Sequence, residues 1–176
     1  MAGTSGGALA AGDGSGDRAD YAARMAYRAD DARRDLLERV AEATDDLSVA
    51  LAALGAAYEQ LDTNTADRLE EQLFRPVQRA FGRARRTHSG FAERHGLEAR
   101  ALSPRQPSHA AAQPRELVED AADAVADADE RLSELQDSMR PVEVGDPELR
   151  AGLAEVREAL AAVQEHADAF LRTLGR

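Results

Sequence analysis

The sequence contains no cysteine, tryptophan, isoleucine or lysine, and aromatic residues make up only 4% of it. Without cysteine there is no disulfide framework, no thiolate nucleophile and no cysteine-based metal site. Without isoleucine, and with few clusters of valine or threonine, no run is typical of a β-strand. The remaining apolar residues are mainly leucine, valine and alanine with four phenylalanines, a set that favours helices.

Long apolar runs are also missing. No stretch approaches the roughly 18 apolar residues that a membrane-spanning helix needs, so no membrane span is expected. Residues 1–16 lack the basic start and the sustained apolar centre of a secretory signal. These features predict a cytoplasmic protein.

Charge is strongly of one sign. All 22 basic residues are arginine and they face 33 acidic residues, which gives a net charge of −11. Such a charge opposes non-specific binding to DNA or to an anionic membrane. An acidic composition with arginine in place of lysine resembles the proteomes of halophilic or high-GC organisms, and it indicates no particular function.

The positive signal is a pair of apolar repeats. One follows a 4-4-3 spacing: Tyr21, Met25, Ala29, Ala32, Leu36, Val40, Ala43, Leu47, Leu51, Leu54 and Tyr58. The other follows a 4-3 spacing: Leu149, Leu153, Val156, Leu160, Val163, Ala167, Phe170 and Leu174. Each spacing places apolar side chains on one face of a helix, and such a face is buried against other helices.

Breaks between the repeats predict the organisation of the chain. We expect a flexible Gly-rich tail over 1–16, a long helix followed by a second helix over 17–96, a linker over 97–113 and a helical hairpin over 114–176, all in one bundle. The long helix should end near Leu61, with Gly55 as its weak point. Residues 62–65 (Asp-Thr-Asn-Thr) form a break whose members are candidate helix caps, and Asn64 with Asp67 resembles a capping pair. Pro76 predicts a kink or a delayed helix start. Pro141 should end the third helix, and Asp146 should cap the last one.

These elements predict an all-α fold, either an antiparallel four-helix bundle or an elongated coiled-coil-like bundle with a long first helix. At 1.5 Å per residue that first helix is roughly 65–70 Å long and outruns its partners. Part of its apolar stripe is then left for a second copy of the chain, so self-association is expected.

Arginines concentrate in one segment. Residues 75–105 hold eight arginines and two acids, and Arg75, Arg79, Arg83 and Arg86 share one helical face. This face could bind phosphate, nucleic acid or an acidic partner. The preferred interpretation is internal pairing with an acidic stripe on the third helix: Glu116, Asp120, Asp123, Asp127, Glu130, Glu134 and Asp137. No aromatic residue lies among the arginines on that face, which argues against nucleic acid.

Histidines give an alternative. His88 and His95 lie on an apolar stripe, and with His166 they could ligate a metal or a haem inside a bundle. Seven residues span about 10.5 Å along a helix, too far for both to bind one ion. Hydrogen-bonded core histidines are the preferred interpretation, and no cofactor is expected.

No set of residues supports an enzymatic reaction. Gly3–Gly7 matches a nucleophile-elbow pattern without the required strand, and Gly7–Gly12 has phosphate-loop spacing with Asp13 where lysine is needed. The sequence therefore predicts a helical interaction or scaffold protein that forms homo-oligomers or docks on a protein partner, with the Arg face as its external contact if one exists.

Overall fold

The structure is a computed structural model that describes residues 14–105 and 112–174. Its elements are α1 (Gly14–Tyr58), α2 (Thr63–Leu69), the π-helical turn η1 (Glu70–Phe74), α3 (Arg75–His95), α4 (Pro114–Asp137), α5 (Arg140–Glu143) and α6 (Pro147–Leu174). These residues form no strand, and the all-α prediction is confirmed. The predicted tail falls outside the described residues up to 13, whereas residues 14–16 already belong to α1.

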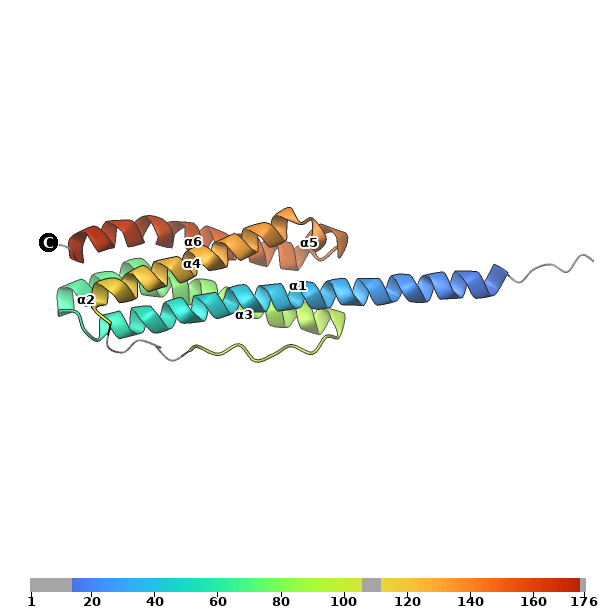
Figure 1. Ribbon diagram of the computed structural model, residues 1–176, viewed down its shortest axis with the longest axis horizontal. Coiled ribbons are helices and arrows are strands. Elements are labelled where there is room, and N and C mark those ends of the chain that lie inside the picture. Colours follow the sequence, from blue (N-terminus) through green and yellow to red (C-terminus); the bar gives the residue numbers. More distant parts are fainter. Residues whose placement is uncertain (1–13, 106–111, 175–176) are drawn as a thin grey trace, which may run out of the picture.

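The long helices lie side by side, and helices in contact run antiparallel to one another (Figure 1). α1 packs most extensively on α4 and also on α3, while α6 packs on α3 and α4. α3 and α4 therefore occupy opposite corners of the cross-section. They run in the same direction, so the chain between them must return along the length of the molecule (Figure 1).

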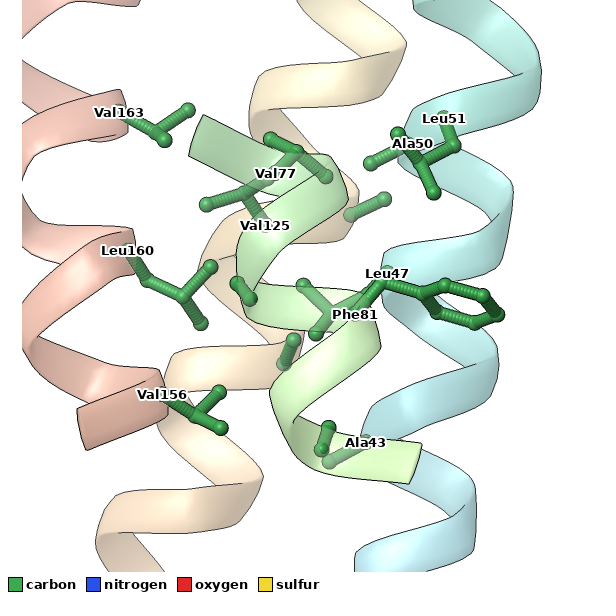
Figure 2. Close-up of a cluster of buried hydrophobic side chains, with 14 of the residues drawn as sticks. Ala43, Leu47, Ala50, Leu51, Val77, Phe81, Val125, Val156, Leu160 and Val163 are labelled. Atoms are coloured by element: carbon green, nitrogen blue, oxygen red, sulfur yellow. The ribbon is translucent and has the colours of Figure 1, made fainter. Parts of the chain in front are cut away.

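The predicted apolar stripes form most of the core. Figure 2 shows Leu47, Val77, Val125 and Leu160, one from each long helix, pointing into the same interior. On α1 the stripe is buried from Leu36 to Leu54, and on α6 it is buried from Leu149 to Phe170. Burial of these faces supplies the main favourable term in folding.

The N-cap of α2 is Asp62, one of the four candidates in the predicted break at residues 62–65. Asp62 Oδ1 accepts hydrogen bonds from the backbone N–H groups of Asn64 (3.1 Å) and Thr65 (3.2 Å). The expected cap by Asn64 and Asp67 was wrong, because α2 already begins at Thr63 and leaves Asn64 inside the helix. Gly55 neither kinks nor ends α1, which continues to Tyr58.

Pro76 is accommodated by a π-helical turn and not by a break. α2, η1 and α3 follow one another without a gap, and η1 directly precedes the proline. Proline has no N–H to donate to the preceding turn, and its ring clashes with the carbonyl four residues earlier. A π turn widens the helix at that point and relieves this clash.

The connection between α4 and α6 is more structured than predicted. α4 ends at Asp137, before the expected stop at Pro141, and Met139 follows with a φ of 60°. A left-handed backbone at a non-glycine residue ends the helix by itself. Pro141 then lies in the first turn of α5, a position that tolerates proline because its missing N–H has no intrahelical partner.

The chain after α3 runs along the bundle without forming a helix. α3 ends at His95 and is capped by Gly96, whose φ of 62° suits glycine, and residues 97–105 then extend over α1. Leu102 is buried there, and Arg100 Nη2 donates to Asp45 Oδ2 at 2.8 Å. We call residues 97–105 the strap.

α1 extends beyond the other helices at the end where α3 and α4 finish (Figure 1). It has 45 residues, against 21 in α3, 24 in α4 and 28 in α6. Residues 18 and 20–28 are exposed around the whole helix. We call residues 18–35 the projecting segment. In the part of the chain that the structure describes, none of the helices has the length and apolarity to cross a membrane.

Candidate interaction surfaces

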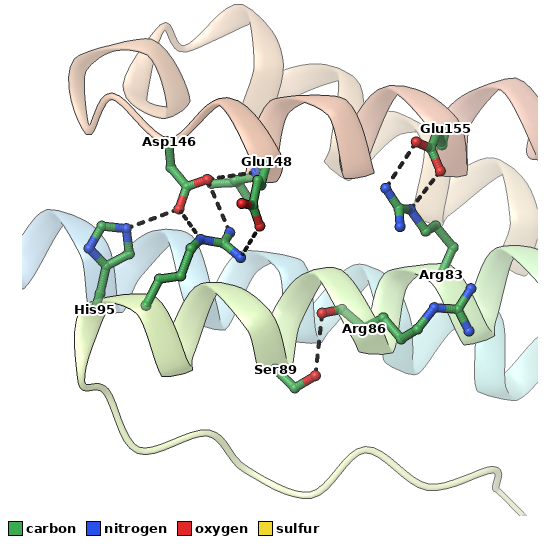
Figure 3. Close-up of polar contacts among 9 residues, drawn as sticks. Arg83, Arg86, Ser89, His95, Asp146, Glu148 and Glu155 are labelled. Carbon is green, nitrogen blue, oxygen red and sulfur yellow. Dashed lines mark hydrogen bonds and ion pairs between the residues drawn. The ribbon is translucent and has the colours of Figure 1, made fainter.

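The predicted Arg face lies along the edge of α3 that meets α6. A groove of about 640 Å³ runs there, lined by Arg79, Arg83 and Arg86 from α3 and by Glu155 and Glu158 from α6. Arg83 Nη2 donates to Glu155 Oε1 at 2.9 Å across the groove (Figure 3). The groove therefore carries both signs of charge.

The four arginines differ in their surroundings. Arg75 forms an ion pair with Glu70 in the preceding turn (2.9 Å), and Arg83 is occupied by Glu155. Arg79 and Arg86 are exposed, and neither forms an ion pair within the described residues. Only two of the four predicted contacts thus keep an unoccupied guanidinium beside the groove.

Among the described residues, one arginine of the Arg face, Arg83, pairs with another helix, and that helix is not the one expected. The acidic stripe of α4 is exposed along its whole length, and α4 lies diagonally opposite α3. The predicted pairing with that stripe was wrong, because α6 separates the two surfaces and supplies the acids itself. The spacing of charged residues located the Arg face on α3, but it could not show which helix packs beside that face.

A buried carboxylate joins the end of α3 to the start of α6. Asp146 is 4% exposed and accepts hydrogen bonds from Arg94 Nε and Nη2, both at 3.0 Å (Figure 3). Its Oδ1 also accepts from the backbone N–H of Leu149 at 2.8 Å, which is the expected helix cap. His95 Nε2 lies 3.1 Å from Oδ2.

These contacts control the ionisation of Asp146. Burial alone would raise the pKa of this carboxyl, but the hydrogen bonds from Arg94, Leu149 and His95 outweigh it and hold the pKa below its ordinary value. Sequence reasoning found the cap and missed the ion pair, since Arg94 lies 52 residues away in the chain. We assign this cluster a structural role.

His88 is a core residue on α3 beside the strap. Its side chain is 2% exposed, and the charged groups that act on it are Arg100 of the strap and Glu38 and Asp45 of α1. Burial lowers the pKa of His88, and the positive charge of Arg100 lowers it further, while the two acids oppose this. His88 is therefore held neutral beneath the strap.

This environment predicts a pH-dependent stability. Because the folded pKa of His88 lies below its ordinary value of 6.5, the unfolded chain binds the proton more readily. The free energy of unfolding should then fall as pH drops from about 7.5 through 6.5 toward the folded pKa. Urea unfolding of wild type and His88→Gln across this range measures the effect, which should be weaker in the variant.

His166→Gln is the matched control, since it removes an exposed histidine at the far end of α6. It should retain the wild-type dependence on pH. If the free energy of unfolding depended on pH equally in wild type and in His88→Gln, protonation of His88 would not contribute to the pH dependence.

The three candidate metal ligands do not share a centre. His88 is buried beside the strap, His95 contacts Asp146, and His166 is exposed on α6. His166 follows Asp146 by twenty residues, about 30 Å along the helix. Across residues 14–105 and 112–174, no three His, Cys, Asp or Glu side chains are grouped as a metal site would need.

The projecting segment carries an exposed apolar stripe. Tyr21 is 62% exposed and Met25 is 46% exposed, although both continue the spacing that buries Leu36 and Val40 further along α1. Where the segment meets the bundle, Met139 and Val142 are exposed as well. Arg140, between them, forms an ion pair with Asp35 of α1, so this corner adjoins the base of the segment.

Sequence reasoning anticipated that part of the first helix would lack a partner within the chain. It did not anticipate the corner formed by Met139 and Val142, because nothing in the local sequence shows that the α4–α5 turn lies against α1. An exposed apolar patch rimmed by polar residues is typical of an interaction site.

Comparison with protein-family models, curated proteins and solved structures gave no match for this chain. The choice of function therefore depends on the two surfaces described above. The groove balances arginines against glutamates, whereas the projecting segment exposes a stripe that is buried elsewhere on the same helix.

Proposed function

We propose that this chain is a helical interaction protein whose docking element is the projecting segment of α1. In this proposal α1, α2–α3, α4 and α6 form an antiparallel four-helix bundle that holds the segment out as a rigid rod. The rod binds by packing its apolar stripe on another helix. The mechanism is helix-on-helix packing, and it involves no chemical step.

One observation carries the proposal. The apolar spacing of α1 passes without interruption from the bundle into the projecting segment, where Tyr21 and Met25 become exposed. An apolar stripe on a helix is normally buried against neighbouring helices. On α1 the stripe continues beyond the ends of α3, α4 and α6 (Figure 1), so its exposed part has no helix to pack against in the described chain. A second helix laid along it would supply that contact.

Photo-crosslinking in cells that naturally produce the chain tests this role. A benzophenone amino acid at Met25 should form covalent adducts with a bound polypeptide after irradiation. The same group at Ala161, an exposed position on α6, serves as the control and should form none. Absence of adducts at Met25, or identical adducts at both positions, would contradict the proposal.

A further inference from the structure

We infer that the partner of the projecting segment is the same segment of a second copy of this chain, packed antiparallel about a twofold axis. This inference rests on the proposed function and names its partner. In this pair Met25 lies level with Ala29 of the second copy, which places the axis near residue 27.

The sizes of the stripe residues favour this arrangement. The segment begins its stripe with two large side chains, Tyr21 and Met25, and continues with two small ones, Ala29 and Ala32. In the antiparallel register Met25 lies opposite Ala29, and Tyr21 lies opposite Ala32, within one residue. Each large side chain then fits against a small one, as close packing requires.

A parallel pair would lack this complementarity. It would set Tyr21 against Tyr21 and Ala29 against Ala29, which crowds one end of the interface and leaves a gap at the other. Overpacking and cavities both destabilise an interface between helices. The side-chain sizes along the segment therefore fit an antiparallel copy of the segment better than a parallel copy.

One pair of charges on a flank of the stripe fits the same orientation. Five charged residues lie along one side of the stripe at spacings of 4, 4, 3 and 4: Asp20, Arg24, Arg28, Asp31 and Asp35. Twofold symmetry places equal flanks of an antiparallel pair against each other. Arg24 of one copy is then level with residue 30 of the other, within reach of Asp31. Asp20 of one copy is level with residue 34 of the other, next to Asp35, whose charge is already offset by Arg39 and Arg140 of its own chain.

Existing ion pairs do not prevent this contact. Arg24 lies 2.9 Å from Asp20, and Asp31 lies 3.1 Å from Arg34, and all four side chains are at least half exposed. Exposed pairs within one helix contribute little stability and exchange partners readily. Arg28 forms no ion pair in the described residues, and in this register it lies level with residue 26 of the second copy, between Arg24 and Arg28, so its charge opposes the contact.

The corner at the base of the segment extends the interface. In the antiparallel register residue 18 of the second copy lies level with Leu36, where α1 enters the bundle. Residues 14–20 hold only Gly, Ser, Ala, Asp and Arg, so the apolar side chain that comes nearest Met139 and Val142 (55% and 44% exposed) is Tyr21 of the second copy, level with residue 33. A contact of about 27 Å between helices thus gains apolar area at both ends.

Two other occupants fit less well. Residues 1–13 contain only Met1 and Leu9 as large apolar residues, too few to cover the stripe. A membrane surface attracts helices with a strongly basic polar face, whereas residues 18–35 carry five arginines and four aspartates. A second copy supplies both the apolar and the charged partners.

The oligomeric state is the first test. Light scattering after size exclusion should give twice the 18.9 kDa mass of the chain at about 100 µM, a concentration suited to contacts of modest area. Met25→Glu should reduce the mass to that of one chain, because the charge would be buried against Ala29. Far-ultraviolet circular dichroism should show unchanged helix, since Met25 lies outside the bundle.

Tyr27→Glu is the matched control. Tyr27 is as exposed as Tyr21, at 67%, but lies on the opposite side of α1 from Met25. This variant should remain a dimer. A monomeric wild type, or a dimer that withstands Met25→Glu, would overturn the inference.

Orientation is tested with spin labels, which the absence of cysteine makes simple. Single cysteines at Tyr27, Arg34 or Glu42 each give one label per chain. In the antiparallel pair, the two labels at a given position are separated along the helices by about 3 Å for each residue between that position and the twofold axis near residue 27. This separation reaches about 20 Å at residue 34 and about 45 Å at residue 42. Equal distances at all three positions would show a parallel pair and overturn the inference.

Failure of the inference can be told apart from failure of the proposed function. A monomeric chain that still crosslinks to another protein through Met25 keeps the docking role and rejects the second copy. A monomeric chain without adducts rejects both.

Discussion

Replacing Asp146 with alanine is expected to lower the free energy of unfolding by about 2–4 kcal/mol. The variant loses the cap on the Leu149 N–H, which contributes about 1 kcal/mol, and the paired hydrogen bonds from Arg94. Hydrogen bonds to charged groups contribute about 1.5–3 kcal/mol, and the partial exposure of Arg94 places this contact toward the lower end. Urea unfolding followed by circular dichroism measures the change.

Glu148→Ala is the matched control for this prediction. Glu148 pairs with the same Arg94, at 2.7 Å, but its side chain is 72% exposed. Exposed pairs contribute at most about 1 kcal/mol, so this variant should stay near wild type. Equal losses in the two variants would show that burial of Asp146 contributes nothing.

Asp146→Asn separates charge from capping, since asparagine also caps helices well. The folded pKa of Asp146 is lowered, so its ionic stabilisation is present above the ordinary value of 3.8 and is lost as pH falls through the folded pKa. The difference in stability between wild type and Asp146→Asn should therefore be largest near neutral pH and should shrink in acid.

Gly152→Ala is expected to destabilise the fold by about 1–3 kcal/mol, although alanine is the better helix former. A Cβ at Gly152 would lie 2.2 Å from Thr87 Oγ1 and 3.0 Å from Thr87 Cβ. Rotating the threonine side chain cannot move its Cβ, so α3 and α6 would have to separate. Thermal or urea unfolding detects this loss.

Two variants make this prediction specific. Thr87→Ala combined with Gly152→Ala removes the two closest atoms and should recover part of the loss. Gly82→Ala is the control, because a Cβ there meets only Arg86 Nη1 at 3.5 Å, and it should stabilise by up to about 1 kcal/mol. If Gly152→Ala stabilised like Gly82→Ala, the close approach of the helices would not limit stability.

Helices and their buried faces could be predicted from the sequence because each depends on local spacing. The stripes around Leu47 and Leu160 are buried where the 4-4-3 and 4-3 patterns place them. Asp146 was identifiable as a cap because it directly precedes Pro147 at the start of α6.

Neighbour relations could not be predicted in the same way. Both α4 and α6 carry exposed acids, so the partner of Arg83 depends on which helix packs beside α3. The pairing of Arg94 with Asp146 likewise depends on where two distant helix ends meet. The candidate docking stripe was visible as a pattern, but its exposed portion is set by the lengths of the other helices.

The path of the strap has a consequence for how the molecule unfolds. The most extensive helix contacts join α1 to α4 and α3 to α6, and each of these pairs has one member before the strap and one after it. Within each half α1 still packs on α3, and α4 on α6, but neither half can bury its apolar faces fully without the other. The two halves should unfold and refold as a single cooperative unit, so that a destabilising substitution at one end of α6 lowers the stability of the whole bundle, including the part of α1 from Leu36 to Tyr58.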